Sequence, residues 1–433
     1  MIVKLLQITI ALIVTSFFFF PFYFTFLPAV NTKMMMAAAG LLVFFVDLSR
    51  KRNANMNQDF FILSLLAASV SLVSFISMTV NDTPDDSYMT YIISMWVWLG
   101  AAYFMVRTVE WVHGKVNVEL LCFYLIGVGA AQCILALAMD QNYAVKSFID
   151  SILEGEGFMG KNEGRIYGLG CALDVAGGRF STLLIMIAYI LPRVVKKRNR
   201  DIYILFLLTA FCLISIVGNI IGRTTTVGMV ISVVYLVYIF LFQKLSDGNE
   251  KKILLRWMLA YFSVAIIISV ILYNVNPQWR EHLRFGFEGF FSLFEEGRWE
   301  VHSNDMLKSH FVFPDNLRAW IIGDGRMAPI DIDPYYIGKN WIGFYMGSDV
   351  GYVRFIFYFG LTGLITFSIL IIKAGLICYK RLSDYRYMFL LFVALNFIIW
   401  LKVSTDIFLV FTPFLCLASM DKNELNDLYK SDL

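Results

Sequence analysis

The chain has 433 residues, of which 59% are hydrophobic and 16% charged, and its formal net charge is +3. A soluble domain is about 45–50% apolar and about 25% charged, so this composition excludes an ordinary soluble protein. The net charge is too small to indicate a nucleic-acid partner. The six cysteines show neither metal spacing nor a disulfide framework.

Apolar runs of about 18 or more residues recur along the chain and predict an all-α polytopic membrane protein with about twelve transmembrane helices. Such runs are too long for strands of a transmembrane barrel. We interpret the first run as an uncleaved span rather than a secretion signal. The last two are short and joined near Ser404, so they could instead form one re-entrant hairpin. The predicted spans are 5–27, 34–49, 59–79, 89–107, 117–139, 178–195, 202–219, 224–243, 254–274, 352–374, 386–402 and 405–420.

Basic residues gather in one set of short loops, which the positive-inside rule assigns to the cytoplasm together with both termini. These residues are Arg50, Lys51, Arg52, Arg193, Lys196, Lys197, Arg198, Arg200, Lys244, Lys251, Lys252, Lys380, Arg381 and Arg386. The two long loops, 140–177 and 274–351, then face outward. We therefore expect one integral membrane domain over 1–433 with two large outer loops.

Each long loop contains a stretch whose apolar residues suit one face of a helix lying on the membrane. These residues are Tyr143, Phe148, Ile149 and Ile152 in the first loop and Phe287, Phe290, Phe291 and Phe294 in the second. A helix simply packed on its neighbours fits the second pattern equally well. The glycine-rich GEGFMGKNEGR that follows the first stretch is not expected to be helical.

Two arginines lie in glycine-containing stretches next to predicted spans, Arg165 in NEGRIYGLG and Arg223 in GNIIGRTTTVGMV. A guanidinium stays charged near lipid and offers a planar fork for phosphate. An ionisable residue at the depth of Arg223 is costly and is therefore a functional candidate. The alternatives are an interface anchor for Arg165 and a snorkelling side chain for Arg223.

The second loop carries Arg298 and Trp299 directly after its amphipathic stretch, in FEEGRWEVHSND. There the guanidinium would lie at head-group level, and the indole could stack on the face of a sugar. Glu295, Glu296 and Glu300 surround Arg298, so a local ion pair is the alternative.

Asp349 and Arg354 lie where a predicted span begins, in MGSDVGYVRFIFYFGLTG. At this outer mouth a carboxylate could accept the proton of a sugar hydroxyl. Arg354 follows about one turn later and could hold Asp349 ionised by proximity. Asp349 could instead cap the helix.

Other polar signals are weaker. Asp331 and Asp333 resemble the paired aspartates of metal-using sugar transferases, but Pro334 favours a turn. Histidine loses its proton near neutral pH, so His302 and His310 could act as bases. No P-loop or dinucleotide fingerprint occurs, so nothing indicates nucleotide hydrolysis.

Four stretches in order along the chain carry a further signal: GRIYGL, GRTTTVGMVISVVYLVY, EEGRWEVHSN with WIIGDG, and SDVGYVRFIFYFGLTG. Their order and spacing resemble the bacterial O-antigen polymerases, relatives of the O-antigen ligases. The resemblance covers most of the chain in topology and implies a GT-C-like membrane fold with two large periplasmic loops. The chain has Thr225 where the family usually has glycine. It has Ser348 and Asp349 about where the ligases carry a histidine, which favours a polymerase.

The resemblance implies that Arg165, Arg223 and Arg298 bind the diphosphate of an undecaprenyl-pyrophosphate-linked oligosaccharide. Asp349, as the base, and Arg298 are the predicted catalytic residues. We place Arg354, Trp299 and His302 in the same substrate site, and we expect the guanidinium groups to meet beside Asp349. Arginines would stabilise the departing diphosphate, so neither a metal nor another cofactor is expected.

The implied activity is glycosyl transfer at the periplasmic face of a bacterial inner membrane. A growing glycan would move from undecaprenyl pyrophosphate onto a lipid-linked repeat unit. The expected partners are that substrate, the lipid bilayer and a chain-length regulator protein, but not nucleic acid. Three alternatives stay open: an O-antigen ligase, a flippase or transporter of lipid-linked oligosaccharides, and a non-catalytic envelope scaffold.

Overall fold

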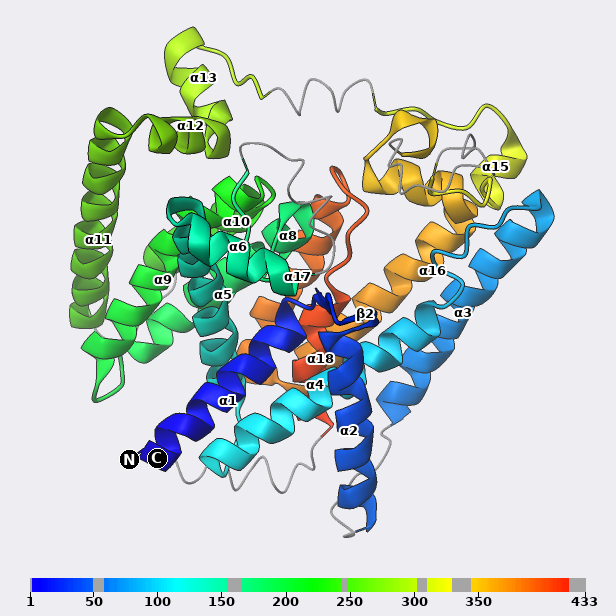
Figure 1. The fold of residues 1–433 in the computed structure, drawn as a ribbon, viewed down its shortest axis with the longest axis horizontal. Coiled ribbons are helices and arrows are strands. Elements are labelled where there is room, and N and C mark those ends of the chain that lie inside the picture. The colour runs from blue at the N-terminus through cyan, green and yellow to red at the C-terminus, as the bar shows by residue number, and fades with distance from the viewer. Residues whose placement is uncertain are drawn as a thin grey trace. The chain divides into compact units, whose positions relative to one another are not determined.

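The computed structural model describes residues 2–49, 58–153, 165–242, 248–301, 310–328 and 344–419. Within these ranges, ten helices are long and apolar enough to cross a membrane, so the chain is a helical, multi-pass membrane protein (Figure 1). They are α1 (Ile2–Phe19), α2 (Thr32–Ser49), α3 (Gln58–Asn81), α4 (Tyr91–His113), α5 (Val118–Gln141), α8 (Leu173–Val194), α9 (Arg200–Ile221), α10 (Thr225–Phe242), α11 (Gly248–Val275) and α16 (Gly351–Arg381). Most ends of these helices lie within a few residues of the ends of the predicted spans.

The largest boundary difference is at the first span, which the apolar run predicts to reach residue 27. Helix α1 ends at Phe19, two residues before Pro21, because a residue that precedes proline is biased away from helical backbone. A small antiparallel hairpin follows, made of β1 (Tyr23–Phe24) and β2 (Leu27–Asn31).

The last two predicted spans are helices, but short ones. Helices α17 (Arg386–Ile399) and α18 (Phe408–Ala418) have 14 and 11 residues. At about 1.5 Å per residue, neither alone covers a hydrocarbon core of about 30 Å. Their connection is fastened, because Trp400 Nε1 donates to the Thr405 carbonyl at 3.2 Å and Asn396 Oδ1 accepts from the Ile407 amide at 3.0 Å.

Short helices form in both long loops. They are α6 (Tyr143–Ile152) in the first loop, and α12 (Pro277–Gly286), α13 (Glu288–Glu296), α15 (Leu317–Ile321) and the 3₁₀ turn η1 (Tyr345–Gly347) in the second. A second 3₁₀ turn, η2 (Ser383–Tyr385), joins α16 to α17. The predicted phenylalanine stripe lies on α13, except that Phe287 precedes the helix. Phe294 is 87% exposed, whereas Phe291 stacks on Tyr273 with ring centroids 5.5 Å apart. The amphipathic helix therefore forms, and it is partly packed on its neighbour α11.

Contacts divide the chain into two compact units whose boundary passes through α2 and α4. Unit 1 comprises Met1–Phe44, Gly100–Trp299 and Glu424–Leu433. Unit 2 comprises Phe45–Leu99 and Glu300–Asn423.

Helix α8 is the core of unit 1 and packs against α5, α9 and α10 (Figure 1). Small residues allow its backbone to approach α10: a Cβ on Gly228 would lie 2.2 Å from Ser181 Cα. Ser181 Oγ also donates to the Thr224 carbonyl at 2.9 Å and accepts from the Gly228 amide at 3.1 Å. Small and hydroxyl-bearing residues at helix contacts are typical of membrane proteins.

We expect Gly228→Val to disrupt this contact, because the nearest atoms belong to the Ser181 backbone and cannot rotate away. Overpacking usually costs about 1–3 kcal/mol and occasionally more. Size-exclusion chromatography of detergent-extracted protein should show aggregation or loss of the folded peak. The matched control is Gly127→Ala, whose new Cβ would meet only side-chain ends at 3.8–3.9 Å and should elute like the wild type. A wild-type profile for Gly228→Val would contradict the close approach of the two helices.

Helix α16 organises unit 2, where it packs against α3, α15, α17 and α18. The helix is interrupted at Gly360, whose φ of 68° and ψ of −173° are nearly reserved for glycine. The Ile321 carbonyl at the end of α15 fills the space beside it, 2.2 Å from where a Cβ would lie. Thr362 Oγ1 donates to the same carbonyl at 2.8 Å. The break leaves a short first segment of α16 directly after Asp349.

Candidate functional site

The turn between α9 and α10 carries Arg223 and is tightly built. Thr225 Oγ1 donates to the carbonyls of Gly218 and Gly222 at 2.9 and 2.8 Å, which satisfies the end of α9. A Cβ on Gly222 would lie 2.3 Å from the Leu173 carbonyl, so the turn also packs closely on the start of α8. Thr225, which stands where the resembled family usually has glycine, therefore has a structural task that leaves Arg223 in place.

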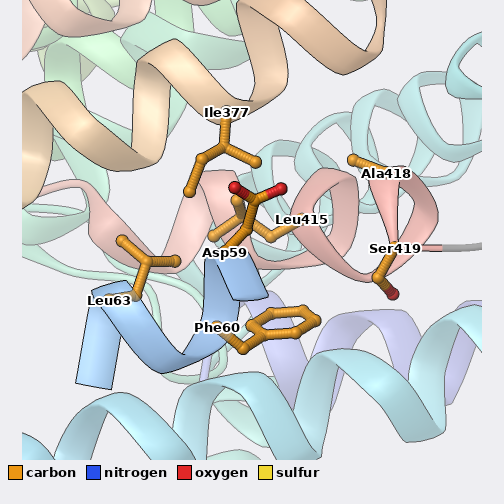
Figure 2. A pocket seen from close by; sticks show the side chains of 7 residues that line it. All are labelled: Asp59, Phe60, Leu63, Ile377, Leu415, Ala418 and Ser419. Carbon is orange, nitrogen blue, oxygen red and sulfur yellow. The ribbon is translucent and has the colours of Figure 1, made fainter. Parts of the chain in front are cut away.

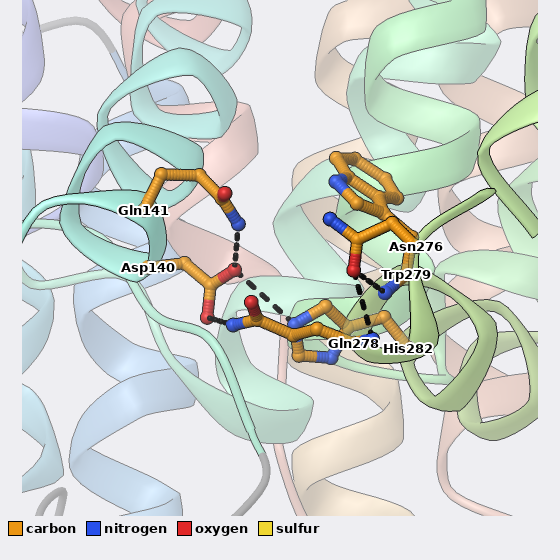
Figure 3. Close-up of polar contacts among 6 residues, drawn as sticks. All are labelled: Asp140, Gln141, Asn276, Gln278, Trp279 and His282. Atoms are coloured by element: carbon orange, nitrogen blue, oxygen red, sulfur yellow. Dashed lines mark hydrogen bonds and ion pairs between the residues drawn. The ribbon is translucent and has the colours of Figure 1, made fainter.

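Helix α12 is held on two sides. Gly286 packs against the end of α9. Toward α5, His282 Nε2 lies 3.2 Å from Asp140 Oδ2, and Gln278 Nε2 donates to Asp140 Oδ1 at 3.0 Å (Figure 3). These contacts fix the position of Phe285, which precedes Gly286 on the same helix.

Two guanidinium groups lie against the ring of Phe285. Cζ of Arg165 is 5.1 Å from the ring centroid, and Cζ of Arg223 is 4.7 Å from it. Arg223 also forms an ion pair with Glu288, the first residue of α13. Among the described residues, none forms a hydrogen bond or ion pair with Arg165. We call Arg165 and Arg223 on Phe285 the arginine pair.

Keeping Arg165 positively charged costs free energy. Burial, and next the neighbouring charge of Arg223, lower the pKa of Arg165, while Asp174 acts in the opposite direction. A cation–π contact is worth about 0.5–2 kcal/mol but does not neutralise the charge. A bound anion would offset both the burial cost and the repulsion, and two guanidinium forks suit the oxygens of a diphosphate. The arginine pair can therefore serve as an anion site, and it brings together two of the predicted diphosphate ligands.

Arg298 and Trp299 follow α13 but do not join the arginine pair. Arg298 is exposed and forms no ion pair with a described residue, and Glu295, one of its candidate partners, pairs with Arg284. Trp299 is 49% exposed, and its ring packs edge-on against Phe290 at 5.0 Å. The alternative of a local ion pair for Arg298 is thus not seen among the described residues, and its role in binding stays a prediction.

Asp349 in unit 2 does not cap α16, so the capping alternative is wrong. The N-cap of the helix is Val350, and it has no side-chain cap hydrogen bond. Asp349 Oδ1 instead lies 2.8 Å from His310 Nδ1. The two side chains are 32% and 23% exposed, which leaves both accessible to a substrate.

The segment around His310 is fixed against the start of α16. Ser348 Oγ donates to the His310 carbonyl at 2.6 Å. Two residues later, Val312 packs against the buried cluster of Val350, Val353 and Phe357. Burial of Ser348 and Val350 leaves Asp349 between them as the more exposed residue. Both partners of the His310–Asp349 pair are therefore held by their own backbones.

Arg354 lies in the same unit and meets several loops. Its Nη1 donates to Ser404 Oγ at 2.7 Å, and its Cζ lies 4.2 Å from the ring centroid of Phe344. Its Nε is buried and has no hydrogen-bond partner among the described residues. Asp349 and Asp85 are within electrostatic range of the guanidinium. Arg354 thus lies within electrostatic range of Asp349, and its role at the site stays a prediction.

No protein family, curated protein or solved structure matches the chain. The functional interpretation is therefore based on the arginine pair of unit 1 and the His310–Asp349 pair of unit 2.

Several predictions fall outside what the structure describes. His302, Asp331, Asp333 and residues 155–164 of the glycine-rich stretch lie outside the described residues. Within the described ranges, no group of three or more His, Cys, Asp or Glu side chains could hold a metal. The expected meeting of the arginine pair and Arg298 with Asp349 involves both units, and it stays a prediction.

A small pocket in unit 2 is structural. It lies where α3, α16 and α18 meet and is lined mainly by apolar side chains such as Leu63 and Ile377 (Figure 2). Its volume is only 10 Å³, whereas pockets for small molecules hold about 300–1,000 Å³. The carboxylate of Asp59 at its edge forms an ion pair with Arg381 at 2.9 Å.

The sequence does not predict that Phe285 and Glu288 belong to the arginine site. Phe285 falls outside the phenylalanine stripe of α13, so no periodic pattern singles it out. Glu288 fits the polar face of that helix and nothing more. His310 is a candidate base from its chemistry, but nothing in the sequence connects it with Asp349, 39 residues away.

Proposed function

We propose that the chain is a glycosyltransferase that extends a glycan carried on a polyprenyl diphosphate, which is the O-antigen polymerase activity that the resemblance implies. The arginine pair supports this most strongly. A partly buried guanidinium that has no ion-pair partner among the described residues and lies beside a second arginine favours a doubly charged ligand such as a diphosphate. A donor of this kind carries its own leaving group, which fits the lack of nucleotide motifs.

The proposed roles divide between the two units. In unit 1, the arginine pair binds the donor diphosphate and stabilises the charge that develops as it leaves, often the largest contribution to catalysis. In unit 2, Asp349 and His310 provide the groups that take the proton of the acceptor hydroxyl. The outer face of a bacterial inner membrane is the proposed location, and a chain-length regulator is the proposed protein partner.

The proposal is tested with purified protein and a synthetic polyprenyl-diphosphate-linked repeat unit. Wild-type protein should produce a ladder of longer lipid-linked glycans. In cells, a deletion strain should still attach single repeat units to its lipopolysaccharide. Loss of every attached repeat would assign the chain to ligation instead, and an unchanged lipid-linked substrate in the purified assay would overturn the enzymatic proposal.

The transporter alternative also has one observation in its favour, the break in α16 at Gly360. Discontinuous helices form the substrate sites of many transporters. Such sites lie near the middle of the membrane, however, whereas Arg165 and Arg223 lie outside the helices, before α8 and between α9 and α10. Vesicles that contain the protein and a fluorescent lipid-linked sugar separate the two: a transporter moves the lipid across the bilayer without forming a new glycosidic bond.

The ion pair between Arg223 and Glu288 gives a further prediction. A diphosphate must compete with the Glu288 carboxylate for Arg223, so Glu288→Gln should bind inorganic pyrophosphate about tenfold more tightly, or about 1.4 kcal/mol. Isothermal titration of the purified protein measures this. The matched control is Glu295→Gln, which removes the partner of Arg284 outside the arginine pair and should not change pyrophosphate affinity. Weaker binding by Glu288→Gln would show that Glu288 supports the site rather than competing for it.

A further inference from the structure

The described residues include two histidine–aspartate pairs, and they differ in a way that bears on chemistry. In unit 1, Asp140 accepts hydrogen bonds from Gln141 and Gln278 and contacts His282 (Figure 3). The side chains of His282 and Asp140 are only 8% and 12% exposed. This pair is closed and fastens α12, so it has a structural task.

The pair in unit 2 is open. Among the described residues, the only hydrogen bond that Asp349 accepts on its side chain is the one from His310. That bond uses His310 Nδ1, and no described residue forms a hydrogen bond with Nε2. The side chains are 23% and 32% exposed, and their backbones are fixed by Ser348 and by the packing of Val312. A carboxylate that holds Nδ1–H leaves the Nε2 lone pair available, which is the arrangement that a general base requires.

We infer that His310, through Nε2, is the general base that takes the proton of the acceptor hydroxyl, and that Asp349 is the positioning residue that holds its ring. This inference rests on the proposed function and reassigns the proton acceptor from Asp349 to its partner. Protonating Asp349 would weaken its bond to His310 and remove a negative charge near Arg354. Protonating His310 instead creates an imidazolium that the Asp349 carboxylate stabilises.

The acceptor oxygen forms a bond to the anomeric carbon of the donor glycan, and the bond between that carbon and the diphosphate oxygen breaks. The diphosphate leaves with the bonding electron pair. The proton of the acceptor hydroxyl passes to His310 Nε2, from which water removes it after the reaction.

The test compares His310→Gln and Asp349→Asn with His113→Gln, which also loses one ring hydrogen bond, to the hydroxyl of Tyr124. The substrate is the synthetic polyprenyl-diphosphate-linked repeat unit. General-base catalysis contributes about 10²–10⁴-fold, so His310→Gln should lower kcat at least about 100-fold with KM for the donor unchanged. Asp349→Asn should also lower kcat, and added imidazole should restore activity to His310→Gly but not to Asp349→Asn. His113→Gln should turn over like the wild type.

Each result bears on a different claim. Elution of all the variants at the wild-type position in size-exclusion chromatography verifies that they are folded. If the wild type forms a ladder and His310→Gln has the wild-type kcat, this inference is wrong and the proposed function still stands. If Asp349→Asn is inactive in the same experiment, Asp349 is the base. Failure of imidazole to restore His310→Gly would also contradict the role of His310. No turnover by the wild type would overturn the proposed function and this inference together.

Discussion

Arg165→Ala is expected to stop glycan extension while leaving the protein folded. The substitution removes the guanidinium that has no ion-pair partner among the described residues, so a diphosphate would lose one of its two cationic contacts. Loss of one preorganised group that stabilises transition-state charge usually lowers kcat by about 10²–10³-fold. In a deletion strain complemented with this variant, lipopolysaccharide should carry single repeats in place of a ladder. Arg165→Lys keeps the charge but not the planar fork and should restore activity only in part.

The matched control for Arg165→Ala is Arg284→Ala. Arg284 also lies over a phenylalanine ring, with its Cζ 5.3 Å from the centroid of Phe291, but it is paired with Glu295. It therefore resembles Arg165 in its contact with an aromatic ring but already has a carboxylate partner. Full ladders from Arg284→Ala and single repeats from Arg165→Ala support the arginine pair. Full ladders from both would remove Arg165 from the proposed site.

Gly360→Ala is expected to have the largest effect on stability in unit 2. The backbone of Gly360 has a conformation that costs other residues about 1–3 kcal/mol. The added Cβ would also lie 2.2 Å from the Ile321 carbonyl, a backbone atom that has to move. Together with overpacking of about 1–3 kcal/mol, the loss should reach about 2–6 kcal/mol and lower the melting temperature of the purified protein by several degrees.

The control for Gly360→Ala is Gly347→Ala in the same unit. Gly347 also has a positive φ, of 69°, but no atom among the described residues lies within 4 Å of the place that an added Cβ would take. Gly347→Ala tests backbone strain without a steric clash. The melting temperature of this variant should therefore fall much less than that of Gly360→Ala. Equal melting temperatures for the two variants would show that contact with Ile321 does not stabilise the break in α16.

The spans are predictable because the membrane imposes length and composition on each helix separately. Helix α9 needs only its own apolar residues to be recognised, and its bounds of Arg200–Ile221 differ little from the predicted 202–219. Ends are less predictable where local chemistry intervenes. Pro21 and the hairpin after it shorten the first span, and the polar start of α8 at Leu173 extends beyond the apolar run whose predicted beginning is 178.

The candidate sites depend on pairings that a single sequence does not encode locally. Arg165 and Arg223 stand out by their chemistry, but their common contact with Phe285 arises only because α12 is fastened to α5 and α9. Asp349 fits both a cap and a base from its place before a helix. The helix N-cap at Val350 decides against the cap. The hydrogen bond between Asp349 and His310 depends on how the chain near Val312 packs at the start of α16.

The most direct test of the account is a cryo-electron microscopy map of the purified protein in lipid nanodiscs with undecaprenyl pyrophosphate. We expect diphosphate density in contact with the guanidinium groups of both Arg165 and Arg223, with the ion pair between Arg223 and Glu288 broken. A head group bound elsewhere, with that ion pair intact and no ligand density beside Arg165, would contradict it.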